Sequence, residues 1–314
     1  MVTFSQPAGD IVDVSGWSDD EDHPTYPIGS KPKRLLMCPQ DVGEGWLHPG
    51  RRYMFKEGVG PRAMQVWSEI LAYRLGLLVG ANVPPAFVAI DAKTGQQGAL
   101  IEYFIDDPAQ PRHARLVHGA DLMQGLLDKK RGRPHGLIEN IVLCRALKAR
   151  SPAGIAAWWA GALAFDAMIG NRDRHPENWG FMVHTQSDKG DVHTMAPLYD
   201  NGVSLGYETL DARLDPAWDD ARAAGYAARG VHHCGWSHDD DKSGQHALLC
   251  GRLAERYPSV RPVMGAMAAM SDADIAEILE WATVFDGPLP FTVGRAAFVA
   301  TLTRVRREAL LAVI

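Results

Sequence analysis

A polar loop lies between two apolar segments near the middle of this chain and constrains the local fold more than any other feature. Residues 153–165 form an apolar run that is followed by Asp166, and the loop begins after Gly170. Because a membrane span needs about 20 apolar residues, this shorter run predicts a buried helix. A strand pattern starts at Trp179. The sequence therefore predicts a helix, a polar loop and a strand in direct succession.

The loop reads Asn-Arg-Asp-Arg-His-Pro-Glu-Asn and contains two residues, Asp173 and Asn178, that suit phosphoryl transfer. That reaction uses a carboxylate to receive or orient the acceptor hydroxyl, and an amide oxygen to hold magnesium. An aspartate and an asparagine at this spacing, taken alone, often occur by chance. Here Asp200 follows 22 residues after Asn178, with a predicted strand hairpin between them, where a kinase has its principal metal-binding aspartate. The alternative interpretation of residues 200–202 is a plain Asp-Asn-Gly turn.

A lysine on a predicted strand and a glutamate on the next helix add to this chemistry. Lys56 ends the strand predicted at residues 52–56, and Glu69 lies on the helix predicted at residues 63–79. A carboxylate on an apolar helix face is costly unless it is paired, so Lys56 is the predicted partner of Glu69. A glutamate at the solvent boundary is the alternative. The apolar residues on the same predicted helix face are Val66, Ile70, Tyr73 and Leu77.

Strand and helix patterns divide the chain into two parts. Residues 1–26 are polar and predict a loosely ordered lead-in with room for a short strand. The strands predicted in the first part are residues 33–37, 52–56, 87–91 and 99–104, around the helix at 63–79. The second part is predicted to be helical at residues 122–127, 136–148, 154–169 and from 272 onward, with one clear strand pair at 179–184 and 192–196.

This distribution predicts an α+β fold of two lobes. The N-lobe, residues 1–105, is rich in sheet, and the C-lobe, residues 106–314, is mainly helical. The boundary falls at an Asp-Asp-Pro sequence, residues 106–108. A chain of 314 residues is long enough for two lobes around a cleft.

In this order the motifs resemble those of the HipA-like serine/threonine kinases. The sequence Tyr-Pro-Ile-Gly-Ser-Lys-Pro-Lys at residues 26–33 is similar to the Gly-rich phosphate loop of that family. Lys56, the Trp-Ser-Glu-Ile-Leu-Ala of residues 67–72 and a Val-Pro-Pro motif follow in the family's order, and the loop with Asp173 and the Tyr-Asp pair ending at Asp200 complete the set. The resemblance covers well over half of the chain. It implies a bilobal, protein-kinase-like fold and an ATP- and Mg²⁺-dependent enzyme that phosphorylates serine or threonine in proteins.

The resemblance implies a role for each matching residue. Asp173 would be the catalytic base, and Asn178 and Asp200 would be the magnesium ligands. Lys56 would hold the nucleotide phosphates, and Glu69 would orient Lys56. The further nucleotide-binding residues implied are the backbone of Glu102, Tyr103 and Phe104 for the adenine, and the loop residues Gly29, Ser30 and Lys33 for the phosphates.

Two features depart from the toxin HipA itself. The residues before the phosphate loop leave no room for the extra N-terminal domain of HipA, so the chain resembles the short, stand-alone members of the family. The loop serine that HipA autophosphorylates is replaced here by Thr25 or Tyr26, although Ser30 is close. The resemblance therefore leaves regulation by loop autophosphorylation open.

His175 has two possible roles. The order Asp173-Arg174-His175 also resembles the catalytic loop of phosphoinositide kinases. An imidazole with an ordinary pKa of about 6.5 is suited to proton transfer, so His175 could share the base role with Asp173. The alternative is that His175 braces the loop by hydrogen bonding.

A second group of histidines, farther along the chain, raises the question of zinc. Its spacing fits no closed four-ligand pattern, which leaves metal binding there open. The residues concerned are His232, His233, Cys234 and His238.

The net charge and the cysteine content indicate which classes of binding partner and which cellular compartment to expect. A formal net charge of -6 argues against a general nucleic-acid-binding surface, and the basic run at residues 129–133 is interpreted as a solvated loop. Four scattered cysteines without a C-x-x-C pair, and a start without a signal-peptide pattern, predict a cytoplasmic protein with no membrane association.

The acceptor of the phosphoryl group has three candidate classes. Serine or threonine of a protein substrate is favoured by the resemblance. A lipid or small-molecule kinase would use the same machinery, but a lipid kinase needs a basic membrane-facing surface, for which the net charge gives little support. A nucleotide-binding pseudokinase that acts as a partner protein has little need of Asp173. The identity of any antitoxin or effector partner stays unknown at this point.

Overall fold

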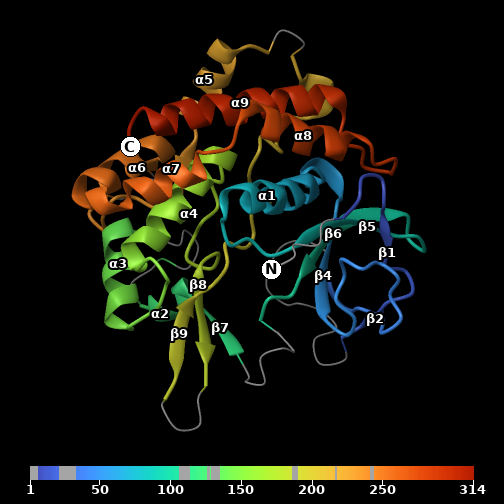
Figure 1. Cartoon of the computed structure of the whole chain (residues 1–314), viewed down its shortest axis with the longest axis horizontal. Helices are drawn as coiled ribbons and strands as arrows, with labels where there is room; N and C mark the ends of the chain where they lie inside the picture. Colours follow the sequence, from blue (N-terminus) through green and yellow to red (C-terminus); the bar gives the residue numbers. More distant parts are fainter. Residues whose placement is uncertain are drawn as a thin grey trace.

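The computed structural model describes residues 6–20, 33–105, 114–125, 128, 135–185, 190–215, 218–240 and 244–314. A lobe built on one large sheet lies beside a mainly helical lobe, as Figure 1 shows, which confirms the α+β class predicted from the sequence. Three of the sequence predictions lie outside the described residues. They are the phosphate-loop segment of residues 26–33 up to residue 32, with Gly29 and Ser30, the lobe boundary at 106–108 and the basic run at 129–133.

The sheet of the N-lobe has the strand order β1-β5-β6-β4-β3-β2. β1 pairs with β5 in parallel, and the other neighbours are antiparallel. The bounds are β1 (Val12–Asp13), β2 (Ser18–Asp19), β3 (Lys33–Met37), β4 (Arg52–Glu57), β5 (Ala86–Asp91) and β6 (Gln96–Glu102).

Alternation along β4 decides which of its side chains reach the interlobe cleft. Tyr53 and Phe55 are fully buried in the core of the lobe, while Met54 and Lys56 point to the other side and line the cleft. The register pairs Lys56 with Lys33 on β3, so two lysines face the cleft from neighbouring strands.

Residues 6–20 are more ordered than the sequence predicted. Val12 and Val14 are buried in the core. The buried Gln6 side chain donates to the carbonyl of Val88 and accepts from its N–H, at 2.9 and 2.8 Å, so that it replaces a strand neighbour for β5. The prediction of a loosely ordered lead-in is therefore wrong for residues 6–20. The segment is polar in composition, but a few buried side chains, Gln6, Val12 and Val14, are enough to hold it against the sheet.

β6 is shifted relative to the strand predicted at residues 99–104. It begins directly after Gly95, whose φ of 69° closes the turn from β5, and it ends at Glu102. Tyr103 and Phe104 therefore lie in the connection between the lobes rather than in the sheet. The Tyr103 N–H donates to the carbonyl of Arg52 at 2.9 Å, which holds the start of this connection against β4.

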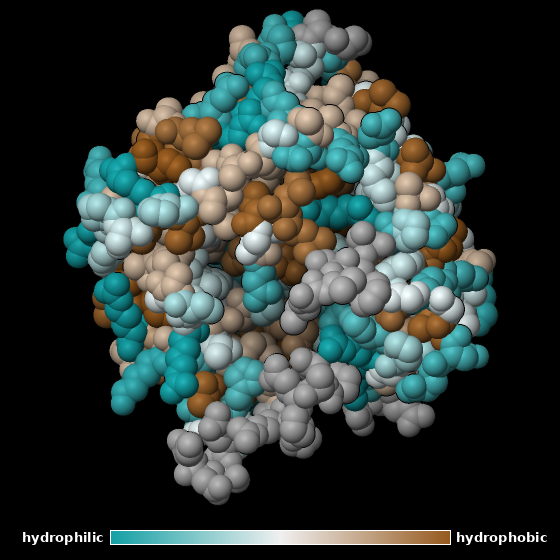
Figure 2. All heavy atoms as spheres, viewed as in Figure 1, coloured by the Kyte–Doolittle hydropathy of each residue, from teal (hydrophilic) through white to brown (hydrophobic). Residues whose placement is uncertain are grey.

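The helix that carries Glu69, α1 (Gln65–Val79), is buried on more than one side. It packs against β5 and β6 and also against a C-terminal helix, α8 (Asp272–Thr283). The single apolar face predicted from the sequence was too narrow, and Leu77, which was assigned to it, is 38% exposed. In Figure 2, hydrophobic residues lie at the surface over α1, near the centre of the face of the molecule that is shown.

The C-lobe combines a small sheet, β7-β8-β9, with helices around the central α4. The helix predicted at residues 122–127 is wrong over its described part, because α2 ends at Leu122 and residues 123–125 form a turn. A strand that the sequence did not indicate, β7, pairs with β8. The bounds are β7 (Ala114–His118), α2 (Gly119–Leu122), α3 (Leu137–Ala146), α4 (Ile155–Ile169), β8 (Gly180–His184), β9 (Val192–Met195), α5 (Asp220–Ala228), β10 (Val231–His232), β11 (Gly244–Gln245), α6 (His246–Arg256), α7 (Arg261–Met267), α8 (Asp272–Thr283) and α9 (Val293–Leu311).

The apolar helix predicted at residues 154–169 is α4, the centre of the C-lobe. Trp159 and Phe165 are fully buried, and α6, α7 and α9 pack around the helix. Burial on all sides explains why α4 is apolar all round. Among the described helices, none combines the length and the apolar character needed to cross a bilayer.

The C-terminal helices return to the N-lobe, where α8 lies beside α1 and α9 packs along α8 (Figure 1). The link between α8 and α9 contacts both the sheet and α1. The indole N–H of Trp67 donates to the carbonyl of Leu289 at 2.8 Å. Gln97 on β6 exchanges two hydrogen bonds with the backbone of Leu289, at 3.1 and 3.0 Å. The link between α8 and α9 thus gives the two lobes a second contact, in addition to the one at the cleft.

Candidate active site

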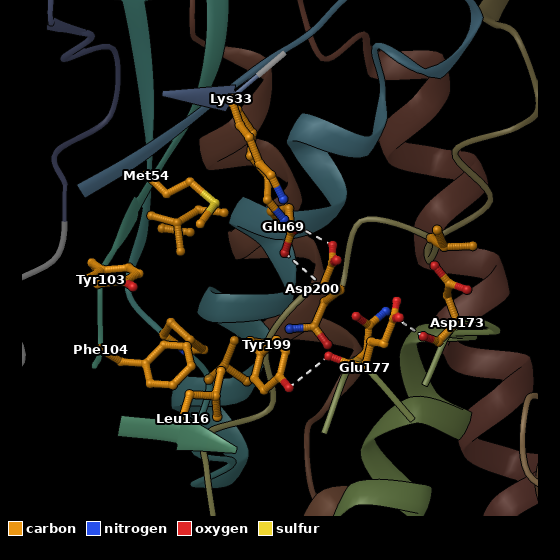
Figure 3. Close-up of a pocket in the computed structure, with 18 of the residues that line it drawn as sticks. Lys33, Met54, Glu69, Tyr103, Phe104, Leu116, Asp173, Glu177, Tyr199 and Asp200 are labelled. Atoms are coloured by element: carbon orange, nitrogen blue, oxygen red, sulfur yellow. Dashed lines mark hydrogen bonds and ion pairs between the residues drawn. The ribbon is translucent and has the colours of Figure 1, made fainter. Parts of the chain in front are cut away.

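A cavity of about 380 Å³ lies between the lobes and has the size of a small-ligand pocket. Residues from β3, β4 and α1 form one wall, and the predicted catalytic loop and the segment around Asp200 form the other (Figure 3). The cavity brings together every predicted site residue that lies within the described ranges. These are Lys33, Lys56, Glu69, Glu102, Tyr103, Phe104, Asp173, His175, Asn178 and Asp200.

The ion pair predicted between Lys56 and Glu69 is present. The Nζ atom of Lys56 lies 2.6 Å from Oε1 of Glu69 and 2.9 Å from Oδ1 of Asp200. Lys56 therefore contacts two carboxylates at once, one from each wall of the cleft. The sequence predicted the contact of Lys56 with Glu69 but not its contact with Asp200.

These contacts shift the pKa values of all three groups. Burial alone would lower the pKa of Lys56, but the Asp200 and Glu69 carboxylates raise it above its ordinary value. Burial opposes ionisation of Asp200, yet the Lys56 ammonium holds the pKa of that carboxyl well below its usual range. Burial raises the pKa of Glu69, against the attraction of Lys56. At neutral pH the site therefore presents a charged lysine and a charged Asp200.

A second cation stands beside this group. Burial and the neighbouring Lys56 ammonium lower the pKa of Lys33, whereas Asp200 and Glu69 oppose that shift. Two ammonium groups on adjacent strands repel one another unless anionic groups lie between them. The pair is therefore matched to a ligand that carries several negative charges, such as a triphosphate.

The catalytic loop is held by its own side chains. The Asp173 N–H donates to Oδ1 of Asn171 at 3.0 Å, and the amide nitrogen of Asn178 donates to the Asp173 carbonyl at 2.7 Å. Because Nδ2 of Asn178 makes this bond, the remaining polar atom of its side chain is the amide oxygen. The Asp173 side chain itself is 40% exposed, so a substrate in the cleft has access to its carboxylate.

His175 supports the loop from the side. Its Nδ1 atom accepts a hydrogen bond of 3.2 Å from the Glu177 N–H, so the neutral ring carries its proton on Nε2. That atom lies 3.9 Å from Oδ1 of Asp173, which is too long for a hydrogen bond. Of the two roles left open by the sequence, this geometry favours bracing.

Asp200 has an unusual backbone. Its φ of 55° lies in the left-handed region, which is strained for a residue with a side chain. The segment is held on both sides of the strain. Arg174 donates to the Tyr199 carbonyl at 2.6 Å, and the Asn201 N–H donates to Oε2 of Glu69 at 2.9 Å. These bonds hold the Asp200 carboxylate toward the cleft.

The part of the cavity lined by Phe104 and Tyr199 suits a flat base. The rings of Phe104 and Tyr199 stack with centroids 5.5 Å apart, and Met54 and Leu116 add apolar wall nearby (Figure 3). The Tyr199 hydroxyl donates to the Glu177 carbonyl at 2.9 Å, which fixes that ring.

The Glu102 side chain points away from any base. It forms an ion pair with Arg51, and it is 8% exposed overall. The Glu102 N–H donates to the carbonyl of Pro85 at 2.8 Å, and the adenine contact implied for the backbone of residues 102–104 stays a prediction.

The donor set fits magnesium and a nucleoside triphosphate. Carboxylate and amide oxygens, as offered by Asp200 and Asn178, are the hard ligands that Mg²⁺ prefers. Lys33 and Lys56 match the phosphates in charge, and the Phe104–Tyr199 stack supplies an apolar place for a base.

Sequence reasoning missed a buried polar network behind the cleft. Arg174, assigned no role from the sequence, is fully buried and joins Asp166 of α4 to Asn201. One signal was present in the sequence, since Asp166 directly follows a long apolar run, and a carboxylate in such a helix requires a buried partner.

The second histidine group belongs partly to this network and forms no metal site in the described residues. His232 Nε2 lies 3.1 Å from Oδ2 of Asp166, and its Nδ1 accepts from the Cys234 N–H at 3.0 Å. Nδ1 of His233 instead lies 3.0 Å from Nδ1 of His135. The side chains thus turn to different partners.

Comparison with known proteins agrees with the fold and the arrangement of the cleft. The family described as HipA-like C-terminal domain matches residues 29–256. The chain belongs to the HipA-like family. This confirms the resemblance drawn from the motifs, and family and fold together place the chain among kinases. No protein of curated function matches the sequence significantly.

Two solved structures share the fold of this HipA-like protein. The proinflammatory kinase CtkA of Helicobacter pylori has a TM-score of 0.67 at 16% identity, over 97% of this chain and 96% of that one. HipA of Shewanella oneidensis MR-1, solved in a toxin–antitoxin complex with HipB and operator DNA, has a TM-score of 0.55 at 17% identity. That match covers 93% of this chain and 66% of HipA.

Proposed function

We propose that this protein is an ATP- and magnesium-dependent kinase that transfers the γ-phosphoryl group to serine or threonine of a protein. The observation that carries the proposal is the position of Lys56 between Glu69 and Asp200, across the cleft from Asp173. A lysine for the phosphates, a metal-binding carboxylate and an accessible base are the parts that phosphoryl transfer requires.

The residues of the cleft then divide the work of the transfer. Lys56 and Lys33 bind the phosphates, and Glu69 keeps Lys56 in place. Asp173 orients the acceptor hydroxyl and takes its proton as the new oxygen–phosphorus bond forms and the bond to the bridging oxygen of ADP breaks. Magnesium held by Asn178 and Asp200 neutralises charge on the phosphate oxygens when bound.

The acceptor class rests on family membership rather than on the cleft. Serine/threonine specificity comes from the resemblance to HipA-like kinases, and a lipid or small-molecule acceptor would use the same residues. Retention of both Asp173 and Lys56 in the cleft argues against a pseudokinase. An antitoxin or effector partner is proposed only by analogy with HipA of S. oneidensis. The four cysteines are buried and none of them forms a disulfide in the described part of the chain, which supports a reducing location such as the cytoplasm.

The test is a transfer assay with purified protein, γ-labelled ATP, Mg²⁺ and a cell lysate, followed by phosphosite mapping. Label on serine or threonine of proteins, absent with the Asp173→Asn variant, is the expected result. Label that appears only in lipid or small-molecule fractions would move the substrate class. Binding of ATP without transfer to any fraction would make the protein a pseudokinase.

A further inference from the structure

Arg174 is a fully buried arginine in a loop whose other charged side chains face the cleft or solvent. Burying a guanidinium costs several kcal/mol unless its charge is paired and its N–H groups are satisfied. The position lies between Asp173 and His175, so the chain buries this charge within the catalytic loop itself.

The guanidinium is anchored on α4 by one carboxylate. Its Nε and one terminal nitrogen donate to the two oxygens of Asp166, at 3.0 and 2.7 Å. Asn171 and His232 supply further contacts to the same carboxylate, at 3.0 and 3.1 Å. Asp166 is completely buried, which by itself would raise its pKa, but Arg174 and His232 hold that pKa well below the usual range, so Asp166 stays ionised as a fixed anchor.

The other end of the guanidinium reaches the two segments that carry the candidate metal ligands. One nitrogen donates to the carbonyl of Asn178 at 3.0 Å and to the carbonyl of Tyr199 at 2.6 Å. Asn178 is itself one candidate ligand, and Tyr199 is bonded directly to Asp200, the other. The second terminal nitrogen donates to Oδ1 of Asn201 at 2.7 Å.

We infer that Arg174 is a positioning residue that sets the separation between the two magnesium ligands, Asn178 and Asp200. The inference rests on the proposed function. A single nitrogen bonded to both backbone segments fixes their distance, because neither can move without breaking a buried hydrogen bond. Asp200 has a strained backbone, so it gains most from a fixed neighbour. Mg²⁺ requires near-ideal octahedral geometry, and its binding is sensitive to small changes in ligand spacing.

Lysine cannot replace arginine in this role. The planar guanidinium offers five donors in a rigid arrangement and here meets five acceptor atoms, whereas an ammonium has three donors around one atom. Arg174→Lys therefore keeps the charge next to Asp166 but cannot hold both backbone segments.

The experiment measures ATP affinity by calorimetry at a series of magnesium concentrations, which requires no phosphate acceptor. Magnesium is expected to increase ATP affinity, and the midpoint of this increase is the quantity compared. For Arg174→Lys, the magnesium concentration at the midpoint should rise at least about tenfold. ATP affinity without magnesium should change less than about twofold, since Lys33 and Lys56 are untouched.

Arg295→Lys is the matched control. Arg295 is also buried and pairs with Asp211, but it lies on α9 and none of its hydrogen bonds reaches a ligand segment. This variant should lose thermal stability with an unchanged magnesium dependence. If Arg174→Lys does not fold, Asn201→Ala removes one acceptor of the guanidinium and should shift the magnesium dependence in the same direction.

Three results would overturn the inference. If the folded Arg174→Lys variant keeps the magnesium dependence of the wild type, Arg174 only stabilises the fold. The same conclusion follows from an unchanged Asn201→Ala variant where Arg174→Lys does not fold. An equal shift in Arg295→Lys assigns the effect to general loosening. Wild-type protein that binds ATP equally with and without magnesium removes the proposed metal site itself, and this failure is distinct because the wild type does not respond.

Discussion

Glu69 uses its two carboxylate oxygens for two different parts of the site. Oε1 contacts the Lys56 ammonium at 2.6 Å, and Oε2 accepts from the backbone N–H of Asn201 at 2.9 Å. Helix α1 is thereby bonded directly to the segment that follows Asp200. Glu69 orients the lysine and also contributes to the position of the candidate metal ligand.

Replacement of Lys56 by methionine should weaken ATP binding about ten- to a hundredfold. A hydrogen bond to a charged group contributes about 1.5–3 kcal/mol, and the phosphates lose such a partner. Glu69 is also left buried without its cation. Titration calorimetry with ATP and Mg²⁺ measures the loss.

Lys93→Met is the matched control for this prediction. Lys93 belongs to the same lobe but bonds to the carbonyl of Ser15, away from the cleft. Its ATP affinity should equal that of the wild type. Equal affinities for wild type and Lys56→Met would remove Lys56 from the nucleotide site.

Asp173→Asn and Asp200→Asn should separate the chemical step from metal binding. The amide at position 173 keeps the shape of the loop but cannot take the hydroxyl proton, so transfer should fall at least about a hundredfold while ATP binding survives. The amide at position 200 removes a charge from the metal site and from Lys56, so magnesium-dependent ATP binding should weaken as well.

Both variants are measured for magnesium–ATP affinity and for transfer to any accepted substrate. Identical losses in both properties would show that the two aspartates do not serve different steps. An active Asp173→Asn variant would move the base role to His175 or to the substrate.

The parts of the site that could be predicted from the sequence are local or follow a simple period. Asp173 and Asn178 share one loop, and Asp200 follows one hairpin later, so their spacing alone indicated a common site. Lys56 and Glu69 were paired because a charge on an apolar helix face requires a partner.

The remaining parts depend on contacts between residues far apart in the chain. The position of Asp166 after an apolar run indicates only that this carboxylate needs a buried partner; that the partner is Arg174, which also reaches Asn201, is decided by the packing of α4. The junction of Gln97 with Leu289 spans 192 residues and has no local pattern. The ordered residues 6–20 were missed because Gln6, a polar side chain, acts as a strand neighbour.

Gln97→Ala should lower the free energy of unfolding by about 1–3 kcal/mol, the cost of one polar group left without a partner. The buried Gln97 side chain satisfies both the N–H and the carbonyl of Leu289, and each buried polar group left without a partner costs about 1–3 kcal/mol. Leu289 keeps one bond, from Trp67, so the loss is partial. Chemical denaturation of the variant measures the change.

Gln96→Ala is the adjacent control and should change stability by less than about 0.5 kcal/mol, as partly exposed positions usually do. Equal unfolding free energies for wild type and Gln97→Ala would mean that the junction between the C-terminal segment and the sheet contributes nothing to stability.

His246 should make the protein less stable as the pH falls from about 6.5 to about 4. Burial, together with the neighbouring His232 and Arg306, lowers the pKa of His246 to about 4, although its bond to the Asn171 carbonyl and the charge of Asp166 oppose the shift. The unfolded chain takes up the proton at its ordinary pKa of about 6.5, before the folded protein does. Stability is therefore lost on acidification at up to about 1.4 kcal/mol per pH unit, and about 3 kcal/mol in total.

Asp166 does not produce the same window. Its pKa is lowered in the folded protein, so the stability it contributes is present above the ordinary aspartate pKa and is lost only as the pH falls below about 4. His246→Gln keeps a side-chain N–H for the Asn171 carbonyl but cannot titrate. Urea unfolding of wild type and variant at about pH 7, 6 and 5, which approach and enter the window between the two pKa values of His246, should give a shallower slope of stability against pH for the variant. Parallel slopes for the two proteins would show that His246 is not the group that couples folding to pH.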